Sequence, residues 1–446
     1  MTKLVDNCTA SRPGSLTPLF FAPFFMCLNM NLFWVALPYI AHWLGGSDTM
    51  VGLCCGLFWG VYAVSCMLSG TIFRHLPPKK TVQLGIATMA ASTLMVAALV
   101  LWQRLAGGKI INPGEFSLPA LVMALLTIPY GVGMAFFWPF LMSWISSGLE
   151  GPRLNRCLGL FSISFSSANV ISPFLGALLV KVHFLPPLPL LGAVNFDIGY
   201  LPPLLGATLS LIFCLVAVSL PHSPGAASAA TESTLIPEHL PPTLERYRWV
   251  ARIGLFISCA AVGLTRGQLP LHFKDLRFDE TQFGIYVSMI CVGNLISFLI
   301  TSRSQAWHYR RGIFYASELL VIAGLALIAR TQSYAWFLAA ALLMGWGSSF
   351  IYASHLYYSM SGSRRRSSTM ALHETTLALG FFVAPFLGGA ISDHYQDRVM
   401  PYQFGIYACA AAIAIQLVLW LALPLQRGAA GGISRPAPLP QPGRRL

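Results

Sequence analysis

Residues 172–179 read SPFLGALL, and residues 384–391 read APFLGGAI. Pro, Phe, Leu and Gly recur in the same order, 212 positions apart, and both stretches lie inside long apolar segments. A proline inside a membrane helix frees a backbone carbonyl and bends the helix, and a nearby glycine lets another helix approach closely. Two bent helices at matching places predict a protein of two similar halves, which suits the movement of one half against the other.

The composition places the chain in a membrane. Hydrophobic residues make up 56% of its 446 residues and charged residues only 10%, whereas soluble domains carry about 25% charged residues. Apolar runs of roughly 20 residues recur along the chain, and each is long enough to cross a bilayer. The fold class we expect is an all-α polytopic membrane protein with twelve transmembrane helices.

A polar gap rich in Pro, Ala and Ser divides the twelve segments six and six, which predicts two pseudo-symmetric six-helix bundles. The expected organisation is a cytoplasmic N-terminal segment (1–16), an N-terminal bundle (17–220), a cytoplasmic linker (221–247), a C-terminal bundle (248–425) and a disordered cytoplasmic tail (426–446).

The basic residues predict the orientation. When the loops are assigned alternately to the two sides of the membrane, 20 of the 28 Lys and Arg residues fall on the side of the N-terminus. The positive-inside rule then places both termini in the cytoplasm, and we expect a bacterial inner (plasma) membrane as the location. This asymmetry also explains the net charge of +13 without a nucleic-acid partner.

The internal repeat extends beyond the opening pair. Residues 52–79 align with residues 284–311 at a constant offset of 232. The GVG of residues 131–133 matches the GWG of residues 345–347 at an offset of 214. Because the three pairs of segments follow the same order, the sequence predicts duplication of a six-helix unit.

Six spans, a polar linker and six more spans resemble the major facilitator superfamily over residues 17–425. The family's loop between the second and third spans usually reads GxLaDrxGrr, and the chain keeps Gly70, Arg74 and Lys79 there. Phe73 and Arg74 stand where the family has an acidic residue. The two PFLG stretches are similar to the family's GPxxGG stretch.

The resemblance implies a secondary active transporter that moves a small solute by alternating access. Its cavity would be lined by the first, fourth, seventh and tenth spans, near the middle of the bilayer. We expect a monomer surrounded by lipid and without a cofactor. The residues with an expected conformational or gating role are Gly70, Arg74, Lys79, Pro173, Gly176, Pro385, Gly388 and Gly389.

Polar residues in the first and fourth spans are substrate-binding candidates. Asn29 and Asn31 are two positions apart, so their side chains point about 200° apart on a helix. Either one can bind solute while the other bonds a neighbouring helix. Tyr130 and Trp138 are eight positions apart and share a face, which is either a binding wall or packing.

The seventh and tenth spans supply four more candidates. Arg266 and Gln268 form either an outer gate or a contact for an anion, unless Arg266 instead extends to the outer membrane interface. Tyr352 and His355 lie along one helical ridge. His355 is either a titrating group in ion coupling or a packed histidine.

His373 and Glu374, at the start of the eleventh span, are the candidates for proton coupling. The alternative for Glu374 is an ion pair with residues 364–366, which are all arginine. We expect Glu318, in the ninth span, to pair with a cation at the membrane interface. The middles of spans one, four, seven and ten carry no acidic residue, so proton coupling, another ion and uniport all stay open. Few fixed charges favour a neutral or amphipathic solute, or a weak anion if Arg266 faces inward.

The sequence contains no GxxxxGK[ST] motif for ATP-driven pumping and no HExxH zinc motif. Its ten cysteines show no spacing typical of a metal site. We therefore expect neither an enzyme nor a metal centre. The alternatives to a transporter are a transporter-like membrane sensor or assembly partner without transport, and a channel.

Overall fold

The computed structural model describes most of the chain. The described ranges are residues 17–72, 76–106, 117–146, 151–182, 184–185, 196–197, 199–221, 241–304, 306–360 and 366–423. Outside these ranges lie the predicted N-terminal segment, most of the predicted linker, most of the predicted tail, and Arg74. Gly70 is described only as part of a helix.

Within the described ranges, twelve helical segments are long and apolar enough to cross a membrane, which confirms the predicted fold class. The first half of the chain forms η1 (Thr17–Phe20), α2 (Ala22–Trp43), α3 (Asp48–Ile72), α4 (Pro78–Leu105), α5 (Leu118–Leu126), α6 (Ile128–Ser146), α7 (Gly151–Val180) and α8 (Leu201–Ser219). The second half forms α9 (Leu244–Asp275), α10 (Glu280–Arg303), α11 (Arg311–Arg330), α12 (Tyr334–Met360), α13 (Arg366–Tyr395) and α14 (Met400–Ala422).

Two details modify a plain bundle of twelve helices. The fourth span is interrupted at Thr127, whose hydroxyl donates to the carbonyl of Ala124, and α6 resumes at Ile128 just before Pro129. Two short strands, β1 (Phe184–Leu185) and β2 (Phe196–Asp197), pair antiparallel between α7 and α8. Otherwise the described chain consists of helices and short connections.

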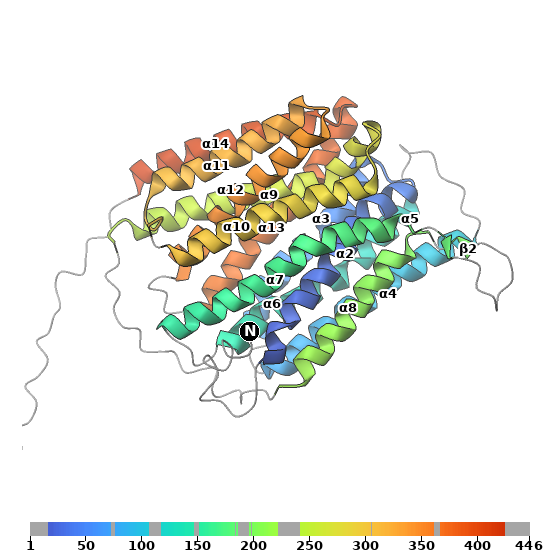
Figure 1. Cartoon of the computed structure of the whole chain (residues 1–446), viewed down its shortest axis with the longest axis horizontal. Coiled ribbons are helices and arrows are strands. Elements are labelled where there is room, and N and C mark those ends of the chain that lie inside the picture. The colour runs from blue at the N-terminus through green and yellow to red at the C-terminus, as the bar shows by residue number, and fades with distance from the viewer. Residues whose placement is uncertain are drawn as a thin grey trace, which may run out of the picture.

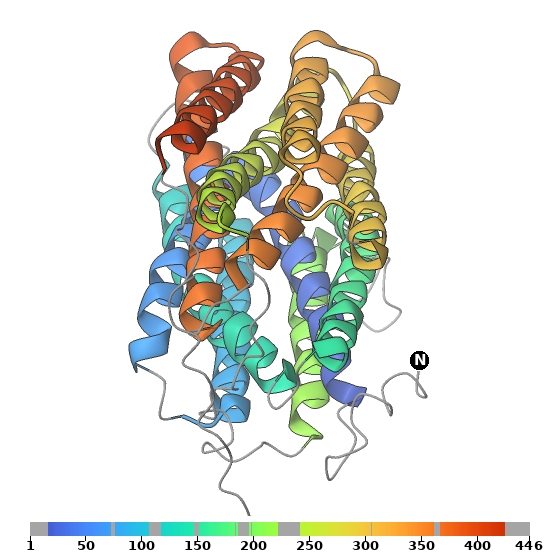
Figure 2. The same cartoon turned by 90° about the vertical axis from the view of Figure 1, so that its left-hand side faces the viewer.

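The helices form two bundles that lie side by side (Figure 1). We call α2–α8 the N-terminal half and α9–α14 the C-terminal half. In Figure 2 most of the yellow to red helices of the C-terminal half lie in the upper part of the molecule, and an orange helix reaches down among the blue helices of the N-terminal half. The end where α2 passes into α3 is called the Asp48 end, and the opposite end, where α8 ends and α9 begins, is called the linker end.

The two repeated stretches both lie on the contact between the halves. The α13 stretch packs on α3, where a Cβ added to Gly52 would lie 2.1 Å from the carbonyl oxygen of Pro385. The α7 stretch packs on α10, where a Cβ added to Gly284 would lie 2.8 Å from the carbonyl oxygen of Pro173. Gly52 and Gly284 are themselves equivalent in the repeat. The two halves therefore meet through a pair of matching contacts, as expected of a duplicated unit.

The glycines within the two stretches differ in their surroundings. A Cβ on Gly389 would lie 2.1 Å from the carbonyl oxygen of Asp48, and one on Gly388 would lie 2.3 Å from the Leu264 side chain. A Cβ on Gly176 would meet the nearest atoms of Leu32 and Val35 at ordinary contact distances of 3.4–3.5 Å. Close approach on that side of the molecule instead depends on Gly284, whose added Cβ would lie 2.4 Å from Cβ of Ala177.

Candidate functional site

Arg266 occupies a central position between the halves. It lies on α9, and its guanidinium donates to Oδ1 of Asn31 on α2, at 2.8 Å. Asn31 in turn donates to Oδ1 of Asn169 on α7, also at 2.8 Å. Because Asn31 is near the middle of α2, this chain of hydrogen bonds lies deep within the bundle. Nine residues, or about 13 Å of helix, separate Arg266 from the end of α9.

One aromatic ring contacts the guanidinium, and two more rings pack on that ring. Trp34 follows Asn31 by three positions and therefore shares its helix face, and the Arg266 guanidinium carbon lies 4.5 Å from the centre of its ring. Trp34 contacts Trp59 of α3 with ring centres 5.1 Å apart. Phe381 of α13 stacks on Trp59 at 4.7 Å. We call Trp34, Trp59, Arg266 and Phe381 the central cluster.

The two asparagines of the first span point to different neighbours, as their spacing predicts. Asn29 accepts a hydrogen bond from the Tyr130 hydroxyl at 2.5 Å and donates to the carbonyl of Ala207 at 3.0 Å. Both bonds stay within the N-terminal half. Trp138, the other aromatic candidate of the fourth span, packs edge-on against Phe161. Asn31 alone of this set reaches the C-terminal half.

A second polar group joins α3, α12 and α13. The Tyr62 hydroxyl donates to Oε2 of Glu374 at 2.8 Å, and this bond crosses between the halves. His373 precedes Glu374 on α13, and its Nδ1 atom lies 2.7 Å from Nδ1 of His355 on α12, with both histidines buried. The Ser359 hydroxyl lies 3.3 Å from Nε2 of His355. The ring of Tyr352 packs edge-on against His373 with centres 4.7 Å apart.

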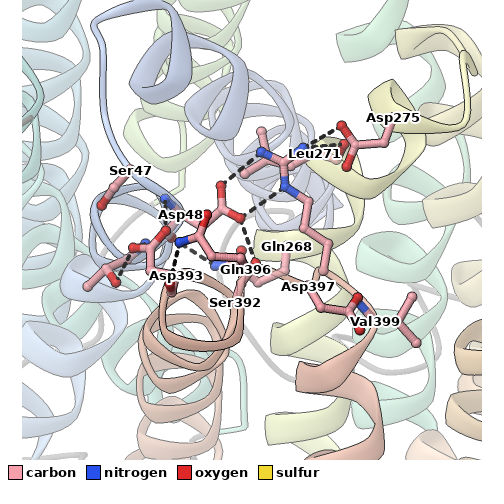
Figure 3. A network of polar contacts seen from close by, with 12 residues as sticks. Ser47, Asp48, Gln268, Leu271, Asp275, Ser392, Asp393, Gln396, Asp397 and Val399 are labelled. Carbon is pink, nitrogen blue, oxygen red and sulfur yellow. Dashed lines mark hydrogen bonds and ion pairs between the residues drawn. The ribbon is translucent and has the colours of Figure 1, made fainter. Parts of the chain in front are cut away.

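A third polar group closes the Asp48 end (Figure 3). Arg398, between α13 and α14, binds both carboxylate oxygens of Asp48, with Nε at 2.9 Å and a terminal nitrogen at 3.1 Å. Its other terminal nitrogen donates to Asp275 of α9 at 2.6 Å. The Ser392 hydroxyl also donates to Asp48, at 2.6 Å. We call these four residues the Asp48 latch.

Backbone contacts extend the latch. The carboxylate of Asp393 accepts from the backbone nitrogens of Asp48 at 3.1 Å and Thr49 at 2.8 Å, at the first turn of α3, where a negative charge is favourable. Gln268 donates to the carbonyls of Pro385 at 2.9 Å and Asp48 at 3.2 Å. The structure thus places Gln268 at the contact between the halves and separates it from its predicted companion Arg266.

The surroundings of Arg398 favour its charged form. Burial alone would lower the pKa of Arg398, but the hydrogen bond and charge of Asp48, with the nearby carboxylate of Asp275, raise it. The pair is largely removed from water, since the Asp48 side chain is 11% exposed and the Arg398 side chain 25%. A charged pair of this kind, with two parallel hydrogen bonds, holds a defined geometry.

Two lysines, Lys181 and Lys79, make polar contacts near the two ends of the bundle. Lys181 pairs with Asp279 across the halves at 2.6 Å, but both side chains are exposed. Lys79 donates to the carbonyls of Ser219 and Pro221 at 2.6 and 2.8 Å. Lys79 lies on α4 and binds carbonyls at the end of α8 that have no partner within that helix. It therefore stabilises the linker end of the N-terminal half.

Glu318 was expected to pair with a cation at the membrane interface, but its partner in the structure is the neutral side chain of Gln416. Its carboxylate accepts a hydrogen bond from Gln416 of α14 at 2.5 Å, and the residue is 3% exposed. The expectation was wrong because Glu318 is two turns inside α11, where α14 covers it. For Glu374, the competing ion pair with residues 364–366 involves side chains outside the described part of the chain.

Sequence reasoning missed several residues of these groups. Asp48, Asp275 and Arg398 lie in or beside loops, where charged residues are common and give no signal of their partners. Trp59 and Tyr62 lie in an apolar segment and look like core residues. Among the described residues, no group of three or more His, Cys, Asp or Glu side chains is placed to hold a metal ion.

Comparison with known proteins identifies the family. The Major Facilitator Superfamily matches residues 19–303 and residues 251–444, which together cover most of the chain. The chain belongs to this superfamily. Family and fold point to a carrier of small molecules, an integral multi-pass membrane protein, rather than to an enzyme.

Solved structures of transporters share the fold. A bacterial homolog of the human lysosomal transporter Spinster, in an inward-facing and unoccupied conformation, has a TM-score of 0.64 and 11% identity, covering 91% of this chain and 95% of that one. The nucleoside transporter NupG has a TM-score of 0.62 and 12% identity, covering 92% and 99%. The human organic anion transporter MFSD10 (TETRAN) has a TM-score of 0.58 and 16% identity, covering 91% and 98%. No curated protein matched the sequence.

Proposed function

We propose that this chain is a secondary active transporter that moves a small solute across the membrane by alternating access. The observation that carries the proposal is the bond from Arg266 to Asn31, a polar contact between the halves deep within the bundle. A solute that binds there contacts both halves at once. Its binding can therefore stabilise one arrangement of the two halves relative to another, as alternating access requires.

The contacts around this centre support movement of whole halves. The matching contacts of Gly52 with Pro385 and of Gly284 with Pro173 allow the backbones of the two halves to meet closely. The Asp48 latch joins the halves at one end only. Rocking about the centre can therefore separate the latch while each half keeps its own packing.

Proton coupling is the second part of the proposal. Glu374 receives the Tyr62 hydrogen bond across the halves, and His373, which precedes it on α13, pairs with His355 of α12. Protonation of the carboxylate removes the charge that strengthens this bond. Proton binding then weakens a contact between the halves and so changes the balance between their two arrangements. Coupling of proton movement to solute movement requires such a change.

The proposed orientation follows from the distribution of basic residues. With both termini in the cytoplasm of a bacterial cell, the linker end faces inward and the Asp48 end faces outward. The latch then closes the outer side of a monomeric transporter. Residues 17–220 and 248–425 are the proposed moving units, joined by a cytoplasmic linker at 221–247.

Solute flux tests the function. The purified full-length protein is reconstituted in proteoliposomes, and uptake of a broad panel of labelled solutes is measured with and without a pH gradient. The expected result is saturable uptake that unlabelled solute on the opposite side accelerates. Flux that neither saturates nor responds to the opposite side indicates a channel. The absence of flux for the whole panel from a stably folded protein favours a sensor or assembly partner.

A further inference from the structure

Arg266 carries a positive charge with no acidic partner in the described part of the chain. Its hydrogen-bond acceptors are the neutral Oδ1 of Asn31 at 2.8 Å and the sulfur of Cys291 at 3.7 Å. None of the ion pairs among the described residues includes it. A charged side chain within the bilayer costs at least about 2.5–3.5 kcal/mol unless it is paired or serves a site. The position of Arg266 at the centre of the bundle therefore favours an anionic ligand as its partner.

Three buried N–H groups of the central cluster lack acceptors. Nε of Arg266 and the indole nitrogens Nε1 of Trp34 and Trp59 are buried and have no hydrogen-bond partner among the described residues. Trp34 and Trp59 are each 3% exposed. All three atoms are N–H donors, and a buried donor without an acceptor costs about 1–3 kcal/mol. One unpaired donor on the cation and two on tryptophans of the same cluster favour a ligand that brings acceptors and negative charge.

The walls of the same cluster are apolar. The flat rings of Trp34, Trp59 and Phe381 contact one another with centres 4.7 to 5.3 Å apart. Two of these rings come from the N-terminal half and one from the C-terminal half. Such surfaces bind a hydrophobic or aromatic body, while a guanidinium binds a carboxylate or related group through two parallel hydrogen bonds.

Resting on the proposed transport function, we propose that the solute is an organic anion with an apolar body, and that Arg266 binds its acidic group. The acidic group replaces Asn31 as the acceptor of Arg266, and the apolar body packs against the rings of the central cluster. Asn31 keeps its bonds to Asn169 at 2.8 Å and to the carbonyl of Cys27 at 3.0 Å. The exchange therefore keeps both bonds that Nδ2 of Asn31 donates, frees its Oδ1, and removes one of the bonds that join the halves.

Thermal stability of the full-length protein in nanodiscs tests the inference. The probes are acetate, phenylacetate and naphthylacetate, each compared with its uncharged amide. The expected result is a saturable rise in Tm with phenylacetate and naphthylacetate, a smaller rise with acetate, and none with the amides. Arg266→Gln weakens apparent binding of the anions about tenfold or more, because a charge-assisted pair is lost.

Control variants separate this role from folding. Arg330→Gln removes the same charge from an exposed position at the end of α11 and retains full binding. If Arg266→Gln does not fold, Arg266→Lys keeps the charge and loses only the parallel hydrogen bonds, so it binds the anions with reduced affinity. Equal stabilisation by anions and amides, no stabilisation by any anion, or unchanged anion binding by Arg266→Gln overturns the inference.

Flux measurements keep the two proposals distinct. Exchange of uncharged solutes that Arg266→Gln leaves unchanged contradicts the inference and leaves the transport function standing. Anion binding that depends on Arg266, without exchange of any bound anion, supports the inference and contradicts the transport function.

Discussion

Replacement of Asp48 by Asn tests whether the latch sets the balance between two arrangements of the halves. The variant removes the charge that binds Arg398 at 2.9 and 3.1 Å and weakens the acceptor of Ser392. The side chain stays nearly isosteric, so packing at the first turn of α3 is kept. The effect of the variant therefore reports the electrostatic part of the latch.

The magnitude follows from the burial of the pair. Exposed ion pairs contribute roughly 0.2–1 kcal/mol, whereas breaking a fully buried pair costs about 3–5 kcal/mol. The Asp48 and Arg398 side chains are 11% and 25% exposed, so the pair lies between these limits. We take about 2 kcal/mol, which shifts the equilibrium between closed and open arrangements about 30-fold.

Distances between spin labels measure this shift. Leu118→Cys at the start of α5 and Gln332→Cys between α11 and α12 place labels on the two halves at the Asp48 end. In lipid nanodiscs, Asp48→Asn is expected to move the population toward longer distances. Asp397→Asn is the matched control, because within the described ranges the one hydrogen bond of this exposed carboxylate is from the backbone nitrogen of Val399. Identical distance distributions for Asp48→Asn and the unsubstituted latch refute the reasoning.

Three further predictions concern other contacts between the halves. Lys181→Gln changes the free-energy difference between the closed and open arrangements by less than about 1 kcal/mol, because the Lys181 and Asp279 side chains are 38% and 47% exposed. The same pair of spin labels measures this change. Burial alone would raise the pKa of Asp279, but the hydrogen bonds from Lys181 and the Gln282 backbone lower it. The pair is therefore intact at neutral pH and is lost only as pH falls below about 3.9 and through the lowered pKa, which a pH series of label distances checks. Gly52→Ala lowers thermal stability by about 1–3 kcal/mol, since the new Cβ meets Pro385 at 2.1 Å, while Gly312→Ala, with nothing within 4 Å, does not. Glu374→Gln abolishes uptake driven by a pH gradient and keeps solute exchange, and unchanged pH-driven uptake in proteoliposomes excludes Glu374 as the coupling site.

The fold could be predicted because it depends on local patterns. A bilayer requires apolar runs of about 20 residues, and such runs are visible in the sequence alone. The duplicated PFLG stretches also marked two equivalent helices correctly. The repeat did not say that each stretch packs on a glycine of the opposite half. That contact joins positions far apart in the chain, and hydropathy carries no information about partners.

The candidate site was predictable only in part. The spacing of Asn29 and Asn31 predicted that the two side chains point in different directions, and in the structure Asn29 bonds within its own half while Asn31 reaches the other half. The Asp48 latch was out of reach, because Asp48 and Arg398 are 350 positions apart and each follows an ordinary loop. Arg266 of the central cluster was a candidate, but Trp34, Trp59 and Phe381 were missed for a different reason. Tryptophans in an apolar segment give the same signal whether they pack or line a site.

Simultaneous measurement of both ends tests alternating access most directly. A second label pair, Lys80→Cys on α4 and Arg303→Cys at the end of α10, reports the linker end. The Asp48 end is reported by Leu118→Cys and Gln332→Cys, and Asp48→Asn supplies the perturbation. Alternating access predicts opposite changes, with longer distances at the Asp48 end and shorter distances at the linker end in the same population. Lengthening at both ends, or movement at one end alone, contradicts it.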